Sequence, residues 1–307
     1  MASGATRLYG TRFMERKPTP WGLQLCSRLL RLCPAEVRGK TRLATALLRP
    51  WRRCGDIVVR ARDGSEFLVP SLGEPIARHL LADGVYEPDL TAFLMHRLQP
   101  GSVFVDVGAN IGVFTMVAAR AVGPAGKVIA VEASPRIYSY LEHNVRANGF
   151  RNIRPRHCAA SCEERANVLF YDAPADHFGM GALSPLFGSQ PTPVPALKLD
   201  DLLAEEGIGR VDLIKLDVQG FEAGVFRGAH QLLTTEPRPL IVFEFVDWAE
   251  GRVPNGKPGD AQRILREYGY TLWRLEDFAA NRRPLAEVVT EGFHMHVAID
   301  TNNASLA

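Results

Sequence analysis

The residues best suited to chemistry lie in a glycine-rich segment that directly follows an apolar run. It reads Phe104-Val-Asp-Val-Gly-Ala-Asn-Ile-Gly112, so the acid Asp106 precedes a turn bounded by Gly108 and Gly112. Glycine tolerates positive φ and lets backbone approach a ligand closely. The helix expected after the turn offers unpaired N–H groups to a carboxylate or phosphate. The pattern indicates a site for a nucleoside-bearing cofactor.

The spacing of the glycines separates two kinds of cofactor. A dinucleotide site uses G-x-G-x-x-G, whose second glycine makes room for pyrophosphate and whose third packs helix against strand. Asn110 and Val113 occupy those two positions here, and the G-x-x-x-x-G-K-[ST] phosphate loop is absent from the sequence. The remaining pattern, D-x-G-x-N-x-G, favours S-adenosylmethionine, which carries no phosphate.

A second acid follows the next apolar run. The segment Lys127-Val-Ile-Ala-Val-Glu132 predicts a buried strand ending at Glu132, and Pro135 suits the first turn of a helix. A carboxylate there can accept hydrogen bonds from both ribose hydroxyls, an interaction worth roughly 1.5–3 kcal/mol. Open α/β sheets bind ligands at the carboxyl ends of their strands, so we expect Asp106 and Glu132 to end neighbouring strands at one edge.

Strand and helix patterns alternate along most of the chain, which predicts an α/β fold: a mostly parallel sheet with helices on both faces. Strands are expected at 57–59, 67–69, 103–107, 128–131, 153–158, 168–171, 211–216, 240–245, 271–275 and 294–299, and helices at 21–33, 74–81, 88–98, 111–122, 136–148, 221–233 and 261–268. Residues 197–206 predict a short strand leading into a helix. Gly, Pro and Ser dominate residues 172–195, which favours an irregular segment that covers the substrate.

Charge divides the chain unevenly and suggests three parts: a basic helical arm (1–55), a catalytic domain (56–300) and a polar tail (301–307). The arm holds 12 Lys/Arg residues and 2 Glu, whereas the remainder holds 24 basic and 32 acidic residues. A helix at 21–33 would carry three leucines on one face, with arginines at its border. Three interpretations remain open: a helix docked on the catalytic body, a peripheral contact with anionic lipid or an acidic polymer, and an organelle presequence.

Several classes of protein are disfavoured by composition. The 307 residues include no apolar run of the ~20 residues needed to span a bilayer and no secretory signal. Five cysteines without C-x-x-C spacing indicate reduced thiols in a cytoplasmic protein, with no disulfide framework. His294 and His296 have no evident acidic or cysteine partner, so we expect no metal site. Aromatic residues are sparse in the basic arm, so no nucleic-acid partner is expected.

Taken together, these residues resemble the FkbM-type methyltransferases, a branch of the class I S-adenosylmethionine-dependent enzymes. The resemblance is dispersed from about Asp56 to Ile299 and leaves out the arm. It rests on Gly84-Val-Tyr-Glu-Pro88, Val105-Asp-Val-Gly-Ala-Asn-Ile-Gly112, Gly126-Lys-Val-Ile-Ala-Val-Glu132, Leu199-Asp-Asp-Leu-Leu203 and Ile214-Lys-Leu-Asp-Val-Gln-Gly-Phe-Glu222. Gln219 stands where the family usually has glutamate, and Cys158-Ala-Ala-Ser161 is a loose counterpart of the family's adenine-side segment.

The resemblance implies a seven-stranded sheet whose last strand is antiparallel, and O-methylation of a hydroxyl on a glycan, glycolipid or secondary metabolite. The residues that it assigns to the cofactor, by position, are Asp106, Gly108, Asn110, Gly112, Glu132, Ala159 and Asp217. Glu222 also matches the family, without a role that the sequence explains. The alternatives are a nicotinamide-dependent oxidoreductase and a non-catalytic membrane-associated binding protein.

Methyl transfer to a hydroxyl also needs a base for the hydroxyl proton, and three residues are candidates. Asp217 follows the strand expected at 211–216, and Glu244 lies near the end of the strand expected at 240–245. His177 lies in the Gly/Pro/Ser-rich segment. Each also has a purely structural interpretation: a capping acid, a buried acid satisfied by backbone donors, and an exposed loop histidine. The sequence leaves this choice open.

Overall fold

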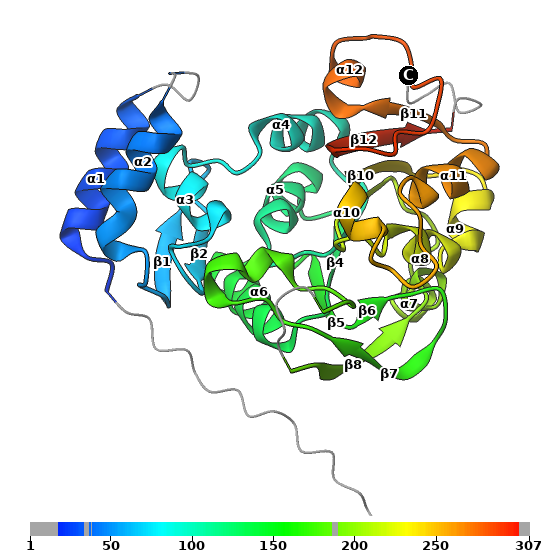
Figure 1. The fold of residues 1–307 in the computed structure, drawn as a ribbon, viewed down its shortest axis with the longest axis horizontal. Helices are drawn as coiled ribbons and strands as arrows, with labels where there is room; N and C mark the ends of the chain where they lie inside the picture. Colours follow the sequence, from blue (N-terminus) through cyan, green and yellow to red (C-terminus); the bar gives the residue numbers. More distant parts are fainter. Residues whose placement is uncertain (1–17, 34–36, 38, 186–189, 301–307) are drawn as a thin grey trace, which may run out of the picture.

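A seven-stranded sheet forms the centre of the protein (Figure 1). The computed structural model describes residues 18–33, 37, 39–185 and 190–300, so the predicted tail at 301–307 and the first 17 residues of the basic arm lie outside the described residues. In spatial order the strands are β5 (Ile153–His157), β4 (Lys127–Glu132), β3 (Val103–Val107), β9 (Leu213–Leu216), β10 (Leu240–Val246), β12 (Phe293–Ile299) and β11 (Thr271–Arg274). The five strands from β5 to β10 pair in parallel, whereas β12 runs antiparallel to both β10 and β11. The predicted architecture is therefore confirmed, including the antiparallel last strand.

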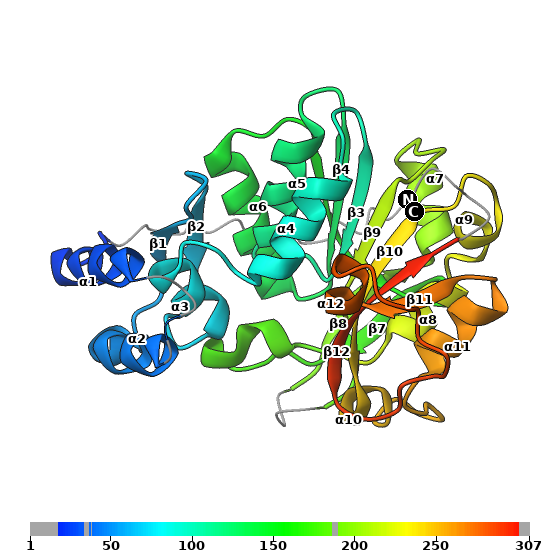
Figure 2. The same cartoon turned by 90° about the horizontal axis from the view of Figure 1, so that it is seen from above.

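Helices cover both faces of this sheet, as expected for parallel strands. Figure 2 shows α4 (Pro88–Arg97), α5 (Val113–Val122) and α6 (Pro135–Asn148) on one side, and α7 (Leu199–Glu205), α8 (Glu222–Arg227), α9 (His230–Thr234) and α11 (Asp260–Glu267) on the other. Alternate strand residues point to opposite faces. Phe104 and Val128 thus join the core beneath α4–α6, whereas Val105 and Ile129 join the core beneath α7–α11.

The amino-terminal part packs against the α4–α6 side. It comprises α1 (Trp21–Leu32), α2 (Lys40–Leu48), the short 3₁₀ helix η1 (Arg49–Trp51), the antiparallel hairpin β1 (Ile57–Arg60) and β2 (Glu66–Val69), and α3 (Pro75–Ala82). Asn144 of α6 holds the hairpin in place: its Oδ1 accepts from Leu68 N–H (2.8 Å), and its Nδ2 donates to the carbonyls of Leu68 and Ile111. The hairpin and the glycine-rich turn thus share one buried amide.

A small second sheet lies beside the carboxyl end of β5. It contains β6 (Ala159–Ala160), β8 (Thr192–Leu197) and β7 (Arg165–Phe170), in that order. Between β7 and β8 lies the 3₁₀ segment η2 (Ala175–Met180), which is flanked by an isolated bridge between Tyr171 and Ala182, and residues 186–189 lie outside the described part. The segment predicted to be irregular therefore contains local structure, and strand β8 begins within it.

The helix predicted at 221–233 is wrong as a single element, because the chain forms α8 and α9 with a break at Gly228. A Cβ atom at Gly228 would lie 1.9 Å from the Ser161 carbonyl oxygen, so another part of the chain approaches the backbone too closely for a side chain. Two short helices, α10 (Asp247–Glu250) and α12 (Leu275–Ala279), were not predicted. No helix in the described part is long and apolar enough to cross a bilayer.

Candidate functional site

The turn between β3 and α5 carries the glycine-rich motif. Gly108, Asn110 and Gly112 all have positive φ, at 76°, 53° and 92°. The N–H groups of Gly108 and Ala109 donate to the Val131 carbonyl oxygen (3.0 and 2.9 Å), which ties the turn to the end of β4. A Cβ atom on Gly108 would lie 1.8 Å from the Asp217 carbonyl oxygen. Glycine at 108 therefore lets the chain leaving β3 pass directly against the chain leaving β9.

Glu132, at the end of β4, is held by this turn. Its Oε2 accepts from Asn110 N–H (2.9 Å) and its Oε1 accepts from Ser134 N–H (2.8 Å). Burial raises the pKa of Glu132 to about 7, although both backbone hydrogen bonds favour the charged form. A carboxylate has about four acceptor positions, so two remain for other donors. This arrangement fits a pair of ribose hydroxyls.

Asp106 is fully buried beneath the turn rather than at its surface. Its Oδ2 accepts from Thr115 Oγ1 (2.6 Å), and its Oδ1 lies 3.3 Å from Lys215 Nζ. Lys215 is also buried; it donates to the Gly108 carbonyl oxygen (2.9 Å) and lies 3.9 Å from Asp217 Oδ2. Although burial alone would lower the pKa of Lys215, the nearby carboxylates raise it, Asp106 most of all. The buried ion pair therefore supports the turn from below.

A cavity of about 60 Å³ opens at the carboxyl ends of β3, β4 and β9. The predicted cofactor residues among its lining are Gly108, Asn110, Glu132, Ala159 and Asp217; Asp106 and Gly112 are not among them. Ligand pockets usually measure about 300–1,000 Å³. This cavity is smaller, and Phe178 and Gly179 of η2 cover one side of it.

The residues of this cavity fit S-adenosylmethionine. Glu132 offers acceptors where a ribose would lie, and the small Ala159 and Ala160 beside the Phe170 ring leave an apolar surface for an adenine. Gly108 and Asn110 add backbone groups to the same cavity, and Asp217 adds a carboxylate; these are the groups that would bind the polar methionine part. Gly112 contributes differently: a Cβ atom there would meet Leu141 Cδ1 at 2.8 Å, so it lets α5 pack close to α6.

Asp217 and Glu244 are brought together beside the cavity. Gln219 Nε2 donates to Asp217 Oδ1 and to Glu244 Oε2, both at 2.8 Å. Burial, followed by the charge of Asp217, raises the pKa of Glu244 well above its usual range. Such a carboxyl group retains its proton to a higher pH and is a stronger base when ionised.

His177 is placed differently from these two acids. Its ring is 46% exposed, its Nδ1 lies 3.2 Å from Asp176 Oδ1, and it is not among the residues that line the cavity. Among the three predicted base candidates, the structure therefore brings Asp217 and Glu244 together and leaves His177 apart.

Three charged residues near the cavity had no role predicted from the sequence. Lys215 could have been found, because a lysine inside an apolar strand is unusual. Glu87 lies in the Gly84–Pro88 motif; burial and then the charge of Asp217 raise its pKa, and its backbone has a positive φ of 42°. Glu222 begins α8, and its Oε1 accepts from the N–H groups of Val218 (3.0 Å) and Gly220 (3.3 Å). Glu222 therefore stabilises the turn that presents Asp217 and Gln219.

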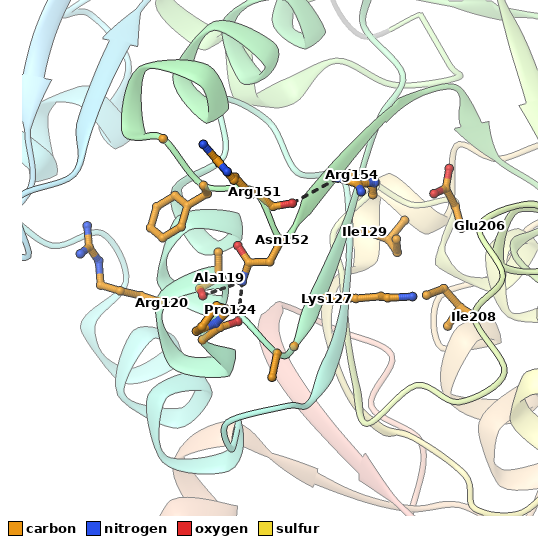
Figure 3. A pocket seen from close by; sticks show the side chains of 15 residues that line it. Ala119, Arg120, Pro124, Lys127, Ile129, Arg151, Asn152, Arg154, Glu206 and Ile208 are labelled. Atoms are coloured by element: carbon orange, nitrogen blue, oxygen red, sulfur yellow. Dashed lines mark hydrogen bonds between the residues drawn. The ribbon is translucent and has the colours of Figure 1, made fainter.

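A larger hollow of about 670 Å³ lies at the opposite, amino-terminal edge of the sheet (Figure 3). Lys127 and Arg154 border it near the starts of β4 and β5, and Asn152 Nδ2 donates to the carbonyls of Ala119 and Gly123 at the end of α5. Cations near the carboxyl ends of helices stabilise the helix dipole. This hollow is distant from the carboxyl edge where open α/β sheets bind their ligands, so the smaller cavity is the better candidate site.

The sheet order, the glycine-rich turn at β3 and the acid at the end of β4 define a class I methyltransferase that depends on S-adenosylmethionine. The model of the methyltransferase FkbM domain matches residues 106–272, more than half of the chain. The chain belongs to this family.

Two relatives are similar over most of their own length. A 31-O-demethyl-FK506 methyltransferase FkbM from Streptomyces tacrolimicus is 29% identical over 219 residues, covering 60% of this chain and 79% of the relative. Methyltransferase sdnD from Sordaria araneosa is 25% identical over 207 residues, covering 58% and 77%. A solved O-methyltransferase from Bacillus cereus, in complex with SAH, has a TM-score of 0.40 at 15% identity, covering 70% of this chain and 81% of that chain. The oxidoreductase alternative receives no support.

Proposed function

We propose that the protein transfers a methyl group to a hydroxyl oxygen of a small molecule or glycan, with Asp217 and Glu244 as the carboxyl pair that accepts the hydroxyl proton. The observation that carries this proposal is the Gln219 amide, which joins the two carboxyl groups at 2.8 Å each beside the cofactor cavity. A relative whose name specifies a 31-O-demethyl substrate supports oxygen as the acceptor atom.

When bound, S-adenosylmethionine supplies an electrophilic methyl group on a sulfonium. Glu132 would hold the ribose, and the Gly108 turn with Asn110 would hold the methionine part. The ionised carboxyl of the pair would take the hydroxyl proton as the acceptor oxygen bonds to the methyl carbon and the carbon–sulfur bond breaks with its electron pair left on sulfur. Alignment of this kind contributes roughly 7–11 kcal/mol in well-oriented reactions.

The test uses the full chain with S-adenosylmethionine labelled with ¹³C in the methyl group and a fractionated extract of hydroxyl-bearing metabolites. We expect a product whose ¹³C shift identifies an O-methyl ether. Glu244→Gln should lower kcat by about 10²–10⁴-fold while leaving the Kd for S-adenosylmethionine unchanged. Glu267→Gln, on the exposed surface of α11, is the matched control. A methyl group found on nitrogen, carbon or sulfur, or full activity in Glu244→Gln, would contradict the proposal.

A further inference from the structure

Helix α1 has two apolar faces, and only one of them serves the fold. Leu23, Ser27 and Leu30 are buried, and Ser27 Oγ donates to the Leu81 carbonyl oxygen of α3 (2.7 Å). The other face is a solvent-exposed stripe with helical spacing. Its four members are Trp21 (81% exposed), Leu25, Leu29 and Leu32 (80%). Folding of the described chain leaves this stripe uncovered.

The neighbouring helix α2 repeats the arrangement. Ala44 and Leu48 are buried, whereas Leu43 and Leu47 are 51% and 39% exposed. The two helices pack against each other at one end of the molecule (Figures 1 and 2). Six large apolar side chains therefore face solvent on two adjacent helices. Scattered single exposed leucines are ordinary on a protein surface, but a concentration of this kind marks an interaction site.

The charge around these helices identifies the partner. Residues 18–55 contain eight Lys/Arg residues and one acid. Two of the cations serve the fold: Lys40 pairs with Asp83 (2.6 Å), and Arg31 donates to the carbonyls of Leu80 and Leu81. Four others are exposed on or beside α1 and α2: Arg28, Arg42, Arg49 and Arg53. Arginines beside a stripe of leucine and tryptophan characterise helices that lie in the interface of an anionic bilayer.

We propose that α1 and α2 form a membrane-docking surface that lays the protein on a bilayer of anionic lipid, with Trp21, Leu25, Leu29 and Leu32 inserted between the headgroups. A second copy of the chain is a poorer partner, because two surfaces of the same positive charge repel each other. Nucleic acid is also a poorer partner, because leucines do not stack on bases and Trp21 is the one aromatic residue of the stripe.

The same part of the chain contacts the segment that covers the cofactor cavity. Arg52 Nη2 lies 3.3 Å from Asp176 Oδ2, and the carboxyl of Glu74 accepts from the backbone of Phe178 and Gly179. Phe178 and Gly179 line the cavity. The cavity cover therefore contacts residues that follow α1 and α2 in the amino-terminal part, which suits an acceptor presented at the membrane surface.

The test is flotation of the full chain with vesicles of phosphatidylcholine, with or without phosphatidylglycerol. We expect binding to the anionic vesicles only, reduced roughly tenfold or more in a Trp21→Ser, Leu29→Ser, Leu32→Ser variant and similarly in an Arg28→Gln, Arg42→Gln, Arg49→Gln variant. Matched controls change exposed residues elsewhere: Leu169→Ser with Phe293→Ser for the apolar change, and Arg151→Gln with Arg154→Gln for the charge change. Both controls should bind as the unchanged chain does.

A second measurement separates docking from folding and from self-association. The Kd for S-adenosylmethionine should be the same in all variants, which shows that each is folded. Sedimentation velocity should show the same oligomeric state in all of them. Absence of vesicle binding by the unchanged chain would overturn the proposal, as would equal binding by the variant with serine at 21, 29 and 32. Self-association of the unchanged chain that is lost only in this serine variant would assign the surface to a second copy instead.

Discussion

At the scale of single residues, the role in cofactor binding that we propose for Glu132 depends on its protonation state. Burial raises its pKa to about 7. In the proposed binding mode the ribose hydroxyls donate to the ionised carboxylate, so we predict that S-adenosylmethionine binds more tightly at pH 8 than at pH 6, by up to roughly tenfold. Glu132→Gln should weaken binding by about 1.5–3 kcal/mol and remove this pH dependence.

Isothermal titration at several pH values measures both effects. Glu142→Gln is the matched control, because Glu142 lies on the outside of α6 in an ion pair with Arg146. Affinity that stays constant with pH in the unchanged chain, or a Glu132→Gln variant that keeps the full affinity, would show that Glu132 does not hold the ribose.

Lys215 illustrates a different kind of residue, one that positions the site from below. Removing one partner of a buried ion pair leaves the other charge uncompensated, which costs about 3–5 kcal/mol. Lys215→Met should therefore lower the free energy of unfolding by that amount and loosen the turn whose Gly108 carbonyl it binds. Adding Asp106→Leu should recover part of the stability, because no buried charge then remains unpaired. Urea unfolding of the two single variants and the double variant gives the coupling free energy between Asp106 and Lys215. If the losses of unfolding free energy in the single variants add up in the double variant, the two residues do not interact directly.

At the scale of elements, the site depends on how closely the loops that leave β3 and β9 approach. A side chain at 108 would need positive φ and would overlap the Asp217 carbonyl oxygen at 1.8 Å. We predict that Gly108→Ala destabilises the protein by at least roughly 1–3 kcal/mol, the usual cost of such backbone strain, and abolishes cofactor binding. Gly209→Ala is the control, because no atom lies within 4 Å of a Cβ there. Equal unfolding midpoints and equal cofactor affinity in the two variants would refute this prediction.

The elements also show how far the sequence predicts the structure. Four of the five parallel strands, β3, β4, β9 and β10, were predictable because strands buried on both faces appear as apolar runs, and the turn at 108–112 was predictable because glycine marks positive φ. The break at Gly228 was not, since it results from the approach of Ser161, which is distant in sequence. For the same reason the sequence placed Asp106 with Glu132 on the cofactor, whereas the structure buries Asp106 against Lys215 and places Gln219 between Asp217 and Glu244.

At the scale of the whole molecule, buried acids make stability depend on pH. Burial is the first cause of a raised pKa in each of them, and further carboxylates add to it. The pKa is raised to about 7 for Glu74, Glu132 and Glu250, and to about 8 for Glu222. The corresponding groups in the unfolded chain lose their protons near pH 4.5. Between pH 4.5 and about pH 8, the folded protein therefore holds more protons than the unfolded chain does.

The free energy of unfolding should therefore fall as pH rises through this interval. His296 and His157 act in the opposite direction, because burial lowers their pKa, to about 3 for His296, but their contribution is complete by about pH 7.5. From pH 6.5 to pH 8 the four acids outweigh the two histidines, so we predict a decrease of stability over this range in the protein without cofactor. Urea unfolding at pH 6.5 and 8.0 measures the decrease. Glu222→Gln should make it smaller, because the amide cannot ionise and its oxygen can still accept from Val218 and Gly220. A stability that is constant or rises over this range would mean that these carboxyl groups are already ionised in the folded protein.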